Sequence, residues 1–207
     1  MARDSQATKA RILAAAFDEF AEYGIAGARV DRIADAAEAN KRMIYVYYGN
    51  KEQLFDQVIQ QALEQGAESV PFDAENLPGY AGAIFDHLTA DPRLMRLVMW
   101  KRLERPEATS LEAESYERKT AALAAAQRGG HVDPTHDPAD LLMLVLGLAQ
   151  AWFTTAGGAT GDAAGGPTWS EYLREGHRAA VIDAVARLVA VHERPEQPAS
   201  ASRAEGQ

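Results

Sequence analysis

The sequence predicts an all-α protein. Apolar residues recur with the spacing of a helix through almost all of the 207 residues, and no segment alternates in the manner of a strand. Several of the periodic segments end at glycine, as at Gly24, Gly49 and Gly129. Apolar residues make up 47 % of the chain, which is enough for a packed core. We therefore expect helices joined by turns.

The first helix is predicted over residues 8–23. Ile12, Ala16 and Phe20 repeat every four residues, and Gly24 follows where the C-terminus of a helix favours glycine. The single apolar stripe indicates that this helix packs on one side and faces water on the other.

Two short helices and one longer helix are predicted next, over 30–37, 40–48 and 51–69. The two short helices are joined by a tight turn, and Gly49 with Asn50 ends the second. Asn40 is a good N-cap, because its side chain can accept a hydrogen bond from a backbone N–H that has no partner in the helix. The side chains expected to face inward are Val30, Ile33, Ala34, Ala37, Ile44, Tyr48, Leu54, Phe55, Val58, Ile59, Ala62 and Leu63.

Five further helices are predicted in the rest of the chain, after a loop bracketed by Pro71 and Pro78. The helix over 93–104 is apolar around most of its circumference and is expected to be buried. The Gly-rich link 157–167 is expected to be mobile, and the polar segment 195–207 to be a disordered tail. The predicted spans are 79–90, 93–104, 109–128, 139–156 and 168–192.

The last two helices each carry two adjacent apolar stripes and therefore need two neighbours. One neighbour is the chain's own core. We expect the other to be the same helix pair of a second copy, which gives a four-helix bundle across a two-fold axis. The alternative is that one chain buries both stripes itself. The predicted interface residues are Leu141, Val145, Leu148, Trp152, Val181, Ala184, Val185 and Leu188.

Composition argues against several other classes of protein. The chain has no cysteine, so disulfides and thiolate metal sites are excluded. Its five histidines lack the spacing of metal ligands, and His131 and His136 lie in a loop-like stretch where a surface position is expected. We expect no cofactor, no metal and no catalytic residue. With no apolar run long enough to span a membrane and no signal-peptide pattern, a cytoplasmic protein is expected.

The second short helix has features that suit a DNA groove. Cationic and hydroxyl side chains can bond phosphates while the first turn of such a helix reaches base edges. The formal net charge is −9, yet residues 1–55 hold eight Lys/Arg and eight Asp/Glu, so the excess acid lies outside this region. The polar residues of the helix are Asn40, Lys41, Arg42, Tyr45, Tyr47 and Tyr48.

The stretch that contains these helices resembles the N-terminal domain of the TetR family of tetracycline-repressor-like regulators. It reads, over residues 8–55, TKARILAAAFDEFAEYGIAGARVDRIADAAEANKRMIYVYYGNKEQLF. The shared pattern runs from Phe17 and Phe20 through Gly24 to Tyr45 and Lys51, and it covers about a quarter of the chain. The remainder fits the all-helical ligand and dimer domain of that family in length and pattern.

The resemblance implies that helix 30–37 crosses the DNA backbone and that helix 40–48 enters the major groove. Lys41, Arg42 and Met43 are expected near base edges, where Arg42 can bond a guanine and Met43 can rest on a thymine methyl. Lys51 is expected to hold a phosphate together with the N-terminus of its helix. The full set of expected DNA-contacting residues is Arg29, Asn40, Lys41, Arg42, Met43, Tyr45, Tyr47 and Lys51.

The chain departs from the family pattern at three positions near the turn. Glu38 replaces a glycine, and a left-handed backbone at a non-glycine residue costs roughly 1–2 kcal/mol. The turn is therefore expected to be either strained or shaped differently here. Ala39 replaces a larger apolar residue. Arg29 replaces a Thr or Ser that caps the second helix; arginine can reach phosphate but cannot accept the capping bond.

Members of the family usually release DNA when a small molecule enters the C-terminal domain. The residues expected to meet such an effector combine aromatic rings with adaptable methionines, which suits an apolar or aromatic ligand. An ordinary core is the alternative for each of them. They are Phe85, Met95, Met99, Trp100, Tyr116 and Trp152.

These observations together predict a homodimeric, ligand-responsive repressor that binds a palindromic operator in double-stranded DNA. The expected domains are a DNA-binding domain over 1–52, a ligand-binding and dimerisation domain over 53–194, and the tail over 195–207. The alternatives are an activator or a ligand-insensitive regulator of the same fold. A helical enzyme is disfavoured, because no P-loop, GxSxG or dinucleotide motif is present.

Overall fold

The computed structural model describes residues 2–155 and 171–191, and for 2–4 and 171–174 it describes the backbone alone. Within these ranges every regular element is an α-helix, as the sequence predicts. None of the described helices is both long enough and apolar enough to cross a membrane. In chain order they are α1 (Ala2–Gly27), α2 (Val30–Ala36), α3 (Lys41–Tyr48), α4 (Lys51–Ser69), α5 (Leu77–Ala90), α6 (Arg93–Glu104), α7 (Ser110–Arg128), α8 (Pro138–Thr154) and α9 (Glu171–Val189).

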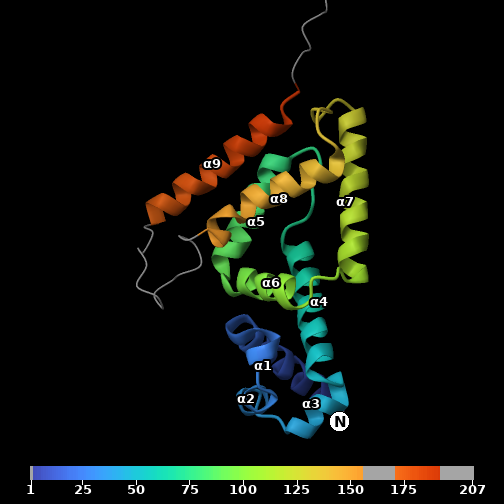
Figure 1. The fold of residues 1–207 in the computed structure, drawn as a ribbon, viewed down its shortest axis with the longest axis vertical. Coiled ribbons are helices and arrows are strands. Elements are labelled where there is room, and N and C mark those ends of the chain that lie inside the picture. The colour runs from blue at the N-terminus through green and yellow to red at the C-terminus, as the bar shows by residue number, and fades with distance from the viewer. Residues whose placement is uncertain (1, 156–170, 192–207) are drawn as a thin grey trace, which may run out of the picture.

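The helices form a head and a body, joined by α4 (Figure 1). The head consists of α1, α2, α3 and the start of α4, and the body consists of α5 to α9. Helix α4 runs from the head into the body. Helix α6 belongs to the body by sequence, yet it packs extensively on α1 and also touches α4 and α5.

The head has its own hydrophobic core, with Phe20 of α1 and Phe55 of α4 at its centre. Their rings meet edge to face, with centroids 5.1 Å apart. Ile12 and Ile33 are fully buried beside them. Leu97 of α6 is also part of this core and is only 1 % exposed. One helix of the body therefore completes the core of the head.

The body contains one large apolar cluster and one small one. In the large cluster, residues of α5, α7, α8 and α9 surround Leu141, Leu142 and Val145. The small cluster lies where α5, α6 and α8 meet, and is built on Phe85 and Met95. Helices α8 and α9 thus each pack one stripe in the chain's own core, as the periodicity predicts. Helix α9 lies along α5 (Figure 1).

Gly24 breaks α1 shortly before its end. Its backbone has φ 66° and ψ −174°, so the regular helix stops there and one further turn follows over residues 25–27. This is the stop that the sequence predicts at Gly24. A Cβ atom at this position would lie 2.8 Å from the ring of Trp100 in α6. Glycine is therefore required twice, for the positive φ and for the close approach of α6.

Some details of the predicted elements are wrong. Helix α1 begins at Ala2 and not at residue 8, and Pro78 lies in the first turn of α5, where its missing N–H does no harm. Helix α6 is not buried around most of its circumference. Only Met95, Leu97 and Lys101 of it are buried, and Leu103 is 73 % exposed, because α6 lies across the junction with one face in water.

Other predicted ends differ by a few residues or lie outside the described ranges. Helix α8 ends at Thr154 rather than 156. The link 157–167, the tail 195–207 and the start of the last predicted helix at 168–170 fall outside the described residues.

The turn between α2 and α3 contains a strained residue, which is one of the two outcomes expected for Glu38. Glu38 has φ 48°, and it is the only described non-glycine residue with a positive φ. Backbone bonds and the side chain of Arg11 satisfy the turn, since Arg11 Nε donates to the carbonyl of Ala37 at 3.1 Å. The surrounding bonds hold the strained conformation in place.

Replacing Glu38 with glycine is expected to stabilise the protein. Relief of the left-handed backbone strain raises the free energy of unfolding, and the greater freedom of glycine in the unfolded chain offsets part of this gain. The net increase in the free energy of unfolding is about 0.5–1 kcal/mol. The melting temperature followed by circular dichroism should rise by roughly 1–4 °C. Glu38→Ala is the control, because it keeps the strain. An equal rise in both variants, or none in Glu38→Gly, would remove the strain argument.

Candidate nucleic-acid interface

Helix α3 is held in place by a cap at its start and by the buried side chain of Ile44. The side chain of Asn40 accepts a hydrogen bond from Arg42 N at 2.8 Å, which confirms its predicted role as N-cap. Ile44 is 2 % exposed and fixes the helix on the head core. With one side fixed, the other side of this short helix is open to solvent.

The open side of α3 presents charged, aromatic and aliphatic groups together. Lys41 and Arg42 are exposed at its first turn, and Tyr45 is 45 % exposed. Val46 is 66 % exposed, and the sequence does not single it out, because valine is typical of a core. A valine on a reading helix can contact a thymine methyl. Met43, by contrast, is half-buried.

Lys41 is paired within the chain. Its ammonium lies 2.7 Å from a carboxylate oxygen of Asp31 in the first turn of α2. The hydrogen bond from Lys41 holds the pKa of the Asp31 carboxyl below its ordinary value, and Asp31 raises the pKa of Lys41. Both side chains are about half exposed, so the pair is open to competition from another anion.

Tyr47 and Tyr48 join α3 to the start of α1. The hydroxyl of Ser5 donates to Tyr47 Oη at 3.3 Å, and the ammonium of Lys9 lies 5.1 Å from the centroid of the Tyr47 ring. The hydroxyl of Tyr48 donates to the carbonyl of Lys9 at 3.0 Å. Burial raises the pKa of the Tyr48 phenol. Ser5 and Lys9 lie about 40 residues from these tyrosines in sequence, so periodicity gives no signal for the contacts.

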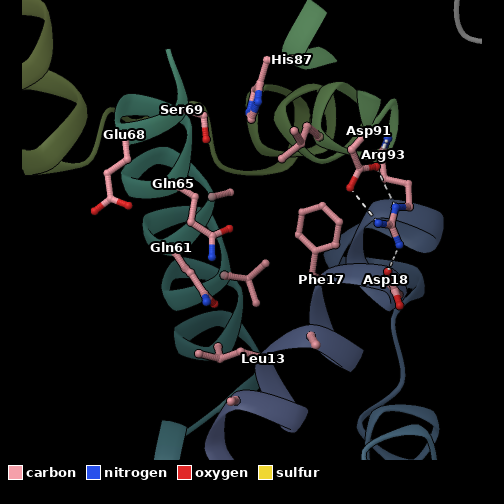
Figure 2. A pocket seen from close by; sticks show the side chains of 15 residues that line it. Leu13, Phe17, Asp18, Gln61, Gln65, Glu68, Ser69, His87, Asp91 and Arg93 are labelled. Carbon is pink, nitrogen blue, oxygen red and sulfur yellow. Dashed lines mark hydrogen bonds and ion pairs between the residues drawn. The ribbon is translucent and has the colours of Figure 1, made fainter. Parts of the chain in front are cut away.

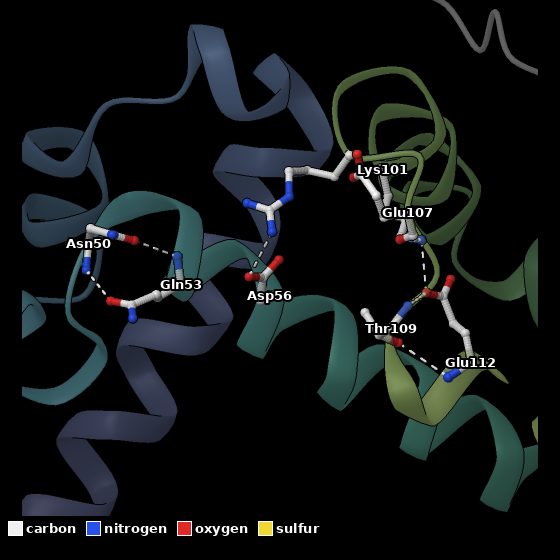
Figure 3. Close-up of polar contacts among 8 residues, drawn as sticks. Asn50, Gln53, Asp56, Lys101, Glu107, Thr109 and Glu112 are labelled. Carbon is white, nitrogen blue, oxygen red and sulfur yellow. Dashed lines mark hydrogen bonds and ion pairs between the residues drawn. The ribbon is translucent and has the colours of Figure 1, made fainter. Parts of the chain in front are cut away.

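Lys51 is placed by the start of α4. Asn50 and Gln53 form a reciprocal capping box there, in which each side chain bonds the backbone of the other residue (Figure 3). The Lys51 ammonium donates to the carbonyl of Ala28 at 3.2 Å. A lysine has three donors, so this bond leaves Lys51 able to bind a phosphate at the helix N-terminus.

Arg29 precedes α2 and makes no side-chain cap, as expected for arginine. The carboxylate of Glu19 in α1 supplies the missing bond, because it accepts from Arg29 N at 2.7 Å. The same carboxylate accepts from Arg32 Nε at 2.8 Å, and this bond raises the pKa of Arg32. Glu19 is only 8 % exposed. Arg29 therefore keeps an exposed side chain on a fixed backbone.

Four of the six residues expected to meet an effector lie together. Phe85, Met95, Met99 and Trp152 belong to the small body cluster, where the Phe85 and Trp152 rings are 6.4 Å apart. The other two lie elsewhere. Trp100 packs on Gly24 of the head, and Tyr116 is 40 % exposed on α7.

His177 of α9 completes this small cluster. Its ring lies 4.9 Å from that of Trp152 and 5.7 Å from that of Phe85. Its buried Nε2 has no hydrogen-bond partner among the described residues, and burial lowers the pKa of the imidazole. The sequence places His177 on an apolar stripe of its helix and gives no reason to expect an unsatisfied nitrogen.

A groove of about 550 Å³ lies between the head and the body (Figure 2). Phe17 of α1 faces Gln61 and Gln65 of α4 across it, and Arg93 closes one end by bonding Asp18 and Asp91. The Arg93 hydrogen bond holds the pKa of Asp91 below its ordinary value. None of the six predicted effector residues lines this groove.

The predicted dimer interface is partly wrong. Leu141, Val145, Val181 and Val185 are each at most 4 % exposed within one chain, so they have no surface to offer to a second copy. They face the large body cluster, because the inner stripes of α8 and α9 pack on α5 and on each other. Of the predicted eight, those with partly exposed side chains are Leu148, Trp152, Ala184 and Leu188.

The head has the geometry of a known class of DNA-binding protein. Two short helices joined by a tight turn, the second with an exposed basic first turn, form a helix-turn-helix DNA-binding head. The body lacks any group of three or more metal-binding side chains in the part of the chain that the structure describes.

Comparison with known proteins agrees with this class. Residues 12–58 match the family described as bacterial regulatory proteins, tetR family, and residues 76–187 match the family described as tetracyclin repressor-like, C-terminal domain. The HTH-type transcriptional repressor SCO4008 of Streptomyces coelicolor is 43 % identical over 153 residues, which cover 72 % of this chain and 80 % of that protein. The HTH-type transcriptional repressor NicS of Pseudomonas putida is 41 % identical over 59 residues, which cover 28 % of this chain and 28 % of that protein.

A solved structure extends the likeness over most of the fold. A crystal structure described as that of a transcriptional regulator, SCO4942 of Streptomyces coelicolor, is 40 % identical with a TM-score of 0.76, and the match covers 88 % of this chain and 98 % of that chain. The chain belongs to the TetR family. It is a DNA-binding transcriptional regulator, and the alternative of a helical enzyme is set aside, because the matched domains and relatives are regulators.

Replacing Asp31 with asparagine is expected to tighten DNA binding. The change releases Lys41 from its ion pair and removes a negative charge beside α3, the helix expected to enter the major groove. The affinity for duplex DNA, measured by fluorescence anisotropy, should rise about three- to tenfold at low salt, and the slope of log affinity against log salt should steepen by about one. Asp35→Asn removes the same charge one turn along α2. If both variants gain equally, Lys41 is not the residue that Asp31 restrains.

Proposed function

We propose that this regulator is a homodimeric repressor that binds a palindromic operator and leaves it when a small apolar or aromatic effector binds the body. The observation that carries the proposal is the packed and capped head, which presents Lys41, Arg42 and Tyr45 on one open helix face. These side chains suit readout of base edges, and Lys51 with Arg29 suits the flanking phosphates. Repression is favoured because the relatives SCO4008 and NicS are named as repressors.

A dimer is favoured because a single head of this size offers few base contacts. Two heads related by a two-fold axis read two half-sites in successive major grooves, and so double the contacts without enlarging the head. The symmetry of the protein then requires a palindromic operator.

The contact between the two copies is proposed on the outer faces of α8 and α9. Leu144 is 45 % exposed and Met143 57 %, and Leu144 lies one turn before Leu148 on α8. On α9, Ala184 and Leu188 are partly exposed. Val191, just beyond the end of α9, is 54 % exposed. This surface joins Leu148, Ala184 and Leu188 of the predicted set to Met143, Leu144 and Val191, which the periodicity does not indicate.

The effector is proposed to bind at the small body cluster. Phe85, Met99 and Trp152 supply aromatic and adaptable surface, and His177 has a buried nitrogen that a ligand could satisfy. Met95 of α6 belongs to the same cluster, so a ligand that parts these side chains also moves α6. Such a ligand changes DNA affinity only if it favours one position of α6 over the other.

The most informative experiment is selection of the operator from random duplex DNA with the purified full chain. The proposal expects an inverted repeat whose half-site centres lie on one face of the duplex. Selection of an asymmetric site, or of no site, would contradict it.

The surface that holds phosphate is tested by a double variant, Lys51→Ala with Tyr47→Phe. Loss of the ammonium and the hydroxyl is expected to weaken binding to the selected operator at least about tenfold. The salt slope should fall by about one for each phosphate that is no longer neutralised. Anisotropy at several salt concentrations measures both. Lys119→Ala, the same charge change on the body, is the control. Normal binding by the double variant would show that the surface is wrongly assigned.

The dimer surface is tested by Leu144→Asp. A charge at this position is expected to separate the two copies and to reduce operator affinity, because one head alone contacts one half-site. Sedimentation velocity should show the monomer mass, while circular dichroism keeps its helical signal. Leu103→Asp makes the same change at the exposed leucine of α6 and should leave the dimer intact. A Leu144→Asp variant that still sediments as a dimer contradicts the proposed surface.

A further inference from the structure

The break at Gly24 creates a short helical turn whose first N–H groups need partners. Residues 25–27 are helical after the break, and Ala28 N closes the turn by donating to the carbonyl of Gly24 at 3.2 Å. The N–H groups at the start of a helical turn have no acceptor within it. A partner from elsewhere in the fold must satisfy those of Ile25 and Ala26.

Glu104 of α6 supplies that partner from 79 residues away in sequence. Its Oε2 accepts from Ile25 N at 2.6 Å, and Ala26 N lies 3.3 and 3.4 Å from its two carboxylate oxygens. A carboxylate that accepts from backbone N–H groups makes hydrogen bonds stronger than neutral ones. Glu104 is thus an N-cap that comes from another helix and, in this fold, from the body.

The capped turn leads directly to two residues that are proposed to hold phosphate. Ala28 follows it, and the Ala28 carbonyl accepts from the Lys51 ammonium. Arg29 is next, with its backbone N–H fixed by Glu19. A shift of the turn would therefore move the acceptor of Lys51 and the backbone of Arg29 together.

The end of α6 that carries Glu104 is anchored in the body. The buried ammonium of Lys101 donates to Glu112 of α7 at 2.8 Å and to the carbonyl of Glu107 at 2.9 Å (Figure 3). Although burial opposes ionisation of Glu112, the bonds from Lys101 and Thr109 hold its pKa below the ordinary value. Arg105 adds a contact with Asp56 of α4 at 3.2 Å. The end of α6 that carries the cap is therefore bonded both to α7 of the body and to the start of α4.

We propose that Glu104 is a positioning residue for DNA binding. It holds the turn at residues 25–28 so that Lys51 and Arg29 meet the phosphates, and it makes this arrangement depend on the position of α6. The inference rests on the proposed function, in that Lys51 and Arg29 contact DNA. Glu104 itself touches no DNA in this proposal.

The test uses the full chain and the operator selected by the wild-type protein. Glu104→Ala removes both acceptors, while Glu104→Gln keeps the shape and one acceptor oxygen and covers the case in which the alanine variant fails to fold. Glu22→Gln is the matched control, since Glu22 pairs with Arg96 across the same α1–α6 contact but caps no backbone in the 25–28 turn. Each variant is also made in the Lys51→Ala background.

The expected result is a loss of operator affinity of about tenfold for Glu104→Ala, with a salt slope lower by about one to two, and a smaller loss for Glu104→Gln. Glu22→Gln should bind as the wild type does. In the Lys51→Ala background the Glu104 substitutions should cost little more, because both act on the same phosphate contact.

Two results would overturn the inference alone. One is a Glu104 variant with a lowered melting temperature but unchanged affinity and salt slope, which would make the residue merely structural. The other is a loss that adds in full to that of Lys51→Ala. A wild-type protein that selects no duplex would instead overturn the proposed function, and the inference with it.

Discussion

The close contact between α6 and α1 at Gly24 is the constraint on which the arrangement of head and body depends. A glycine with positive φ lets the backbone of α1 lie against the Trp100 ring. From that contact follow the burial of Leu97 in the head core and the cap that Glu104 gives to the turn after Gly24. A helix of the body is in this way part of the folded head. The two units cannot move independently without exposing apolar surface and breaking the bonds from Ile25 N and Ala26 N to Glu104.

Three cations of the head have partners within the chain. Lys41 pairs with Asp31, Arg32 with Glu19, and Lys51 with the carbonyl of Ala28. These partners reduce the entropy lost when the side chains meet phosphates, and they also compete with the phosphates. Because residues 1–55 carry no net charge while the rest of the chain carries −9, the acidic body favours approach of DNA from the head side.

The sequence is informative where one helix determines its own structure. The helical periodicity places α4 and α6 at their observed ends, and the glycine pattern locates the break at Gly24. The family pattern singles out Glu38 as the position where the turn is either strained or reshaped, and the structure has the strained form. Prediction from the sequence fails where the structure depends on how two helices pack together. Which stripe of α8 faces inward depends on α5 and α9, so periodicity assigns Leu141 and Val145 to a dimer surface although they lie in the core. Glu104 and Glu19 escape prediction for the same reason, since a carboxylate that bonds backbone far along the chain leaves no local pattern.

The most direct test of the link between the body and DNA binding is amide hydrogen exchange at Ile25 and Ala26, measured with and without the selected operator. If the Glu104 cap favours the DNA-binding position of Lys51, linkage requires that bound DNA also favours the cap. Exchange at these two amides should then slow when operator is added, and the slowing should be lost in Lys51→Ala at saturating operator. Equal exchange rates in the free and bound wild-type protein would contradict the account.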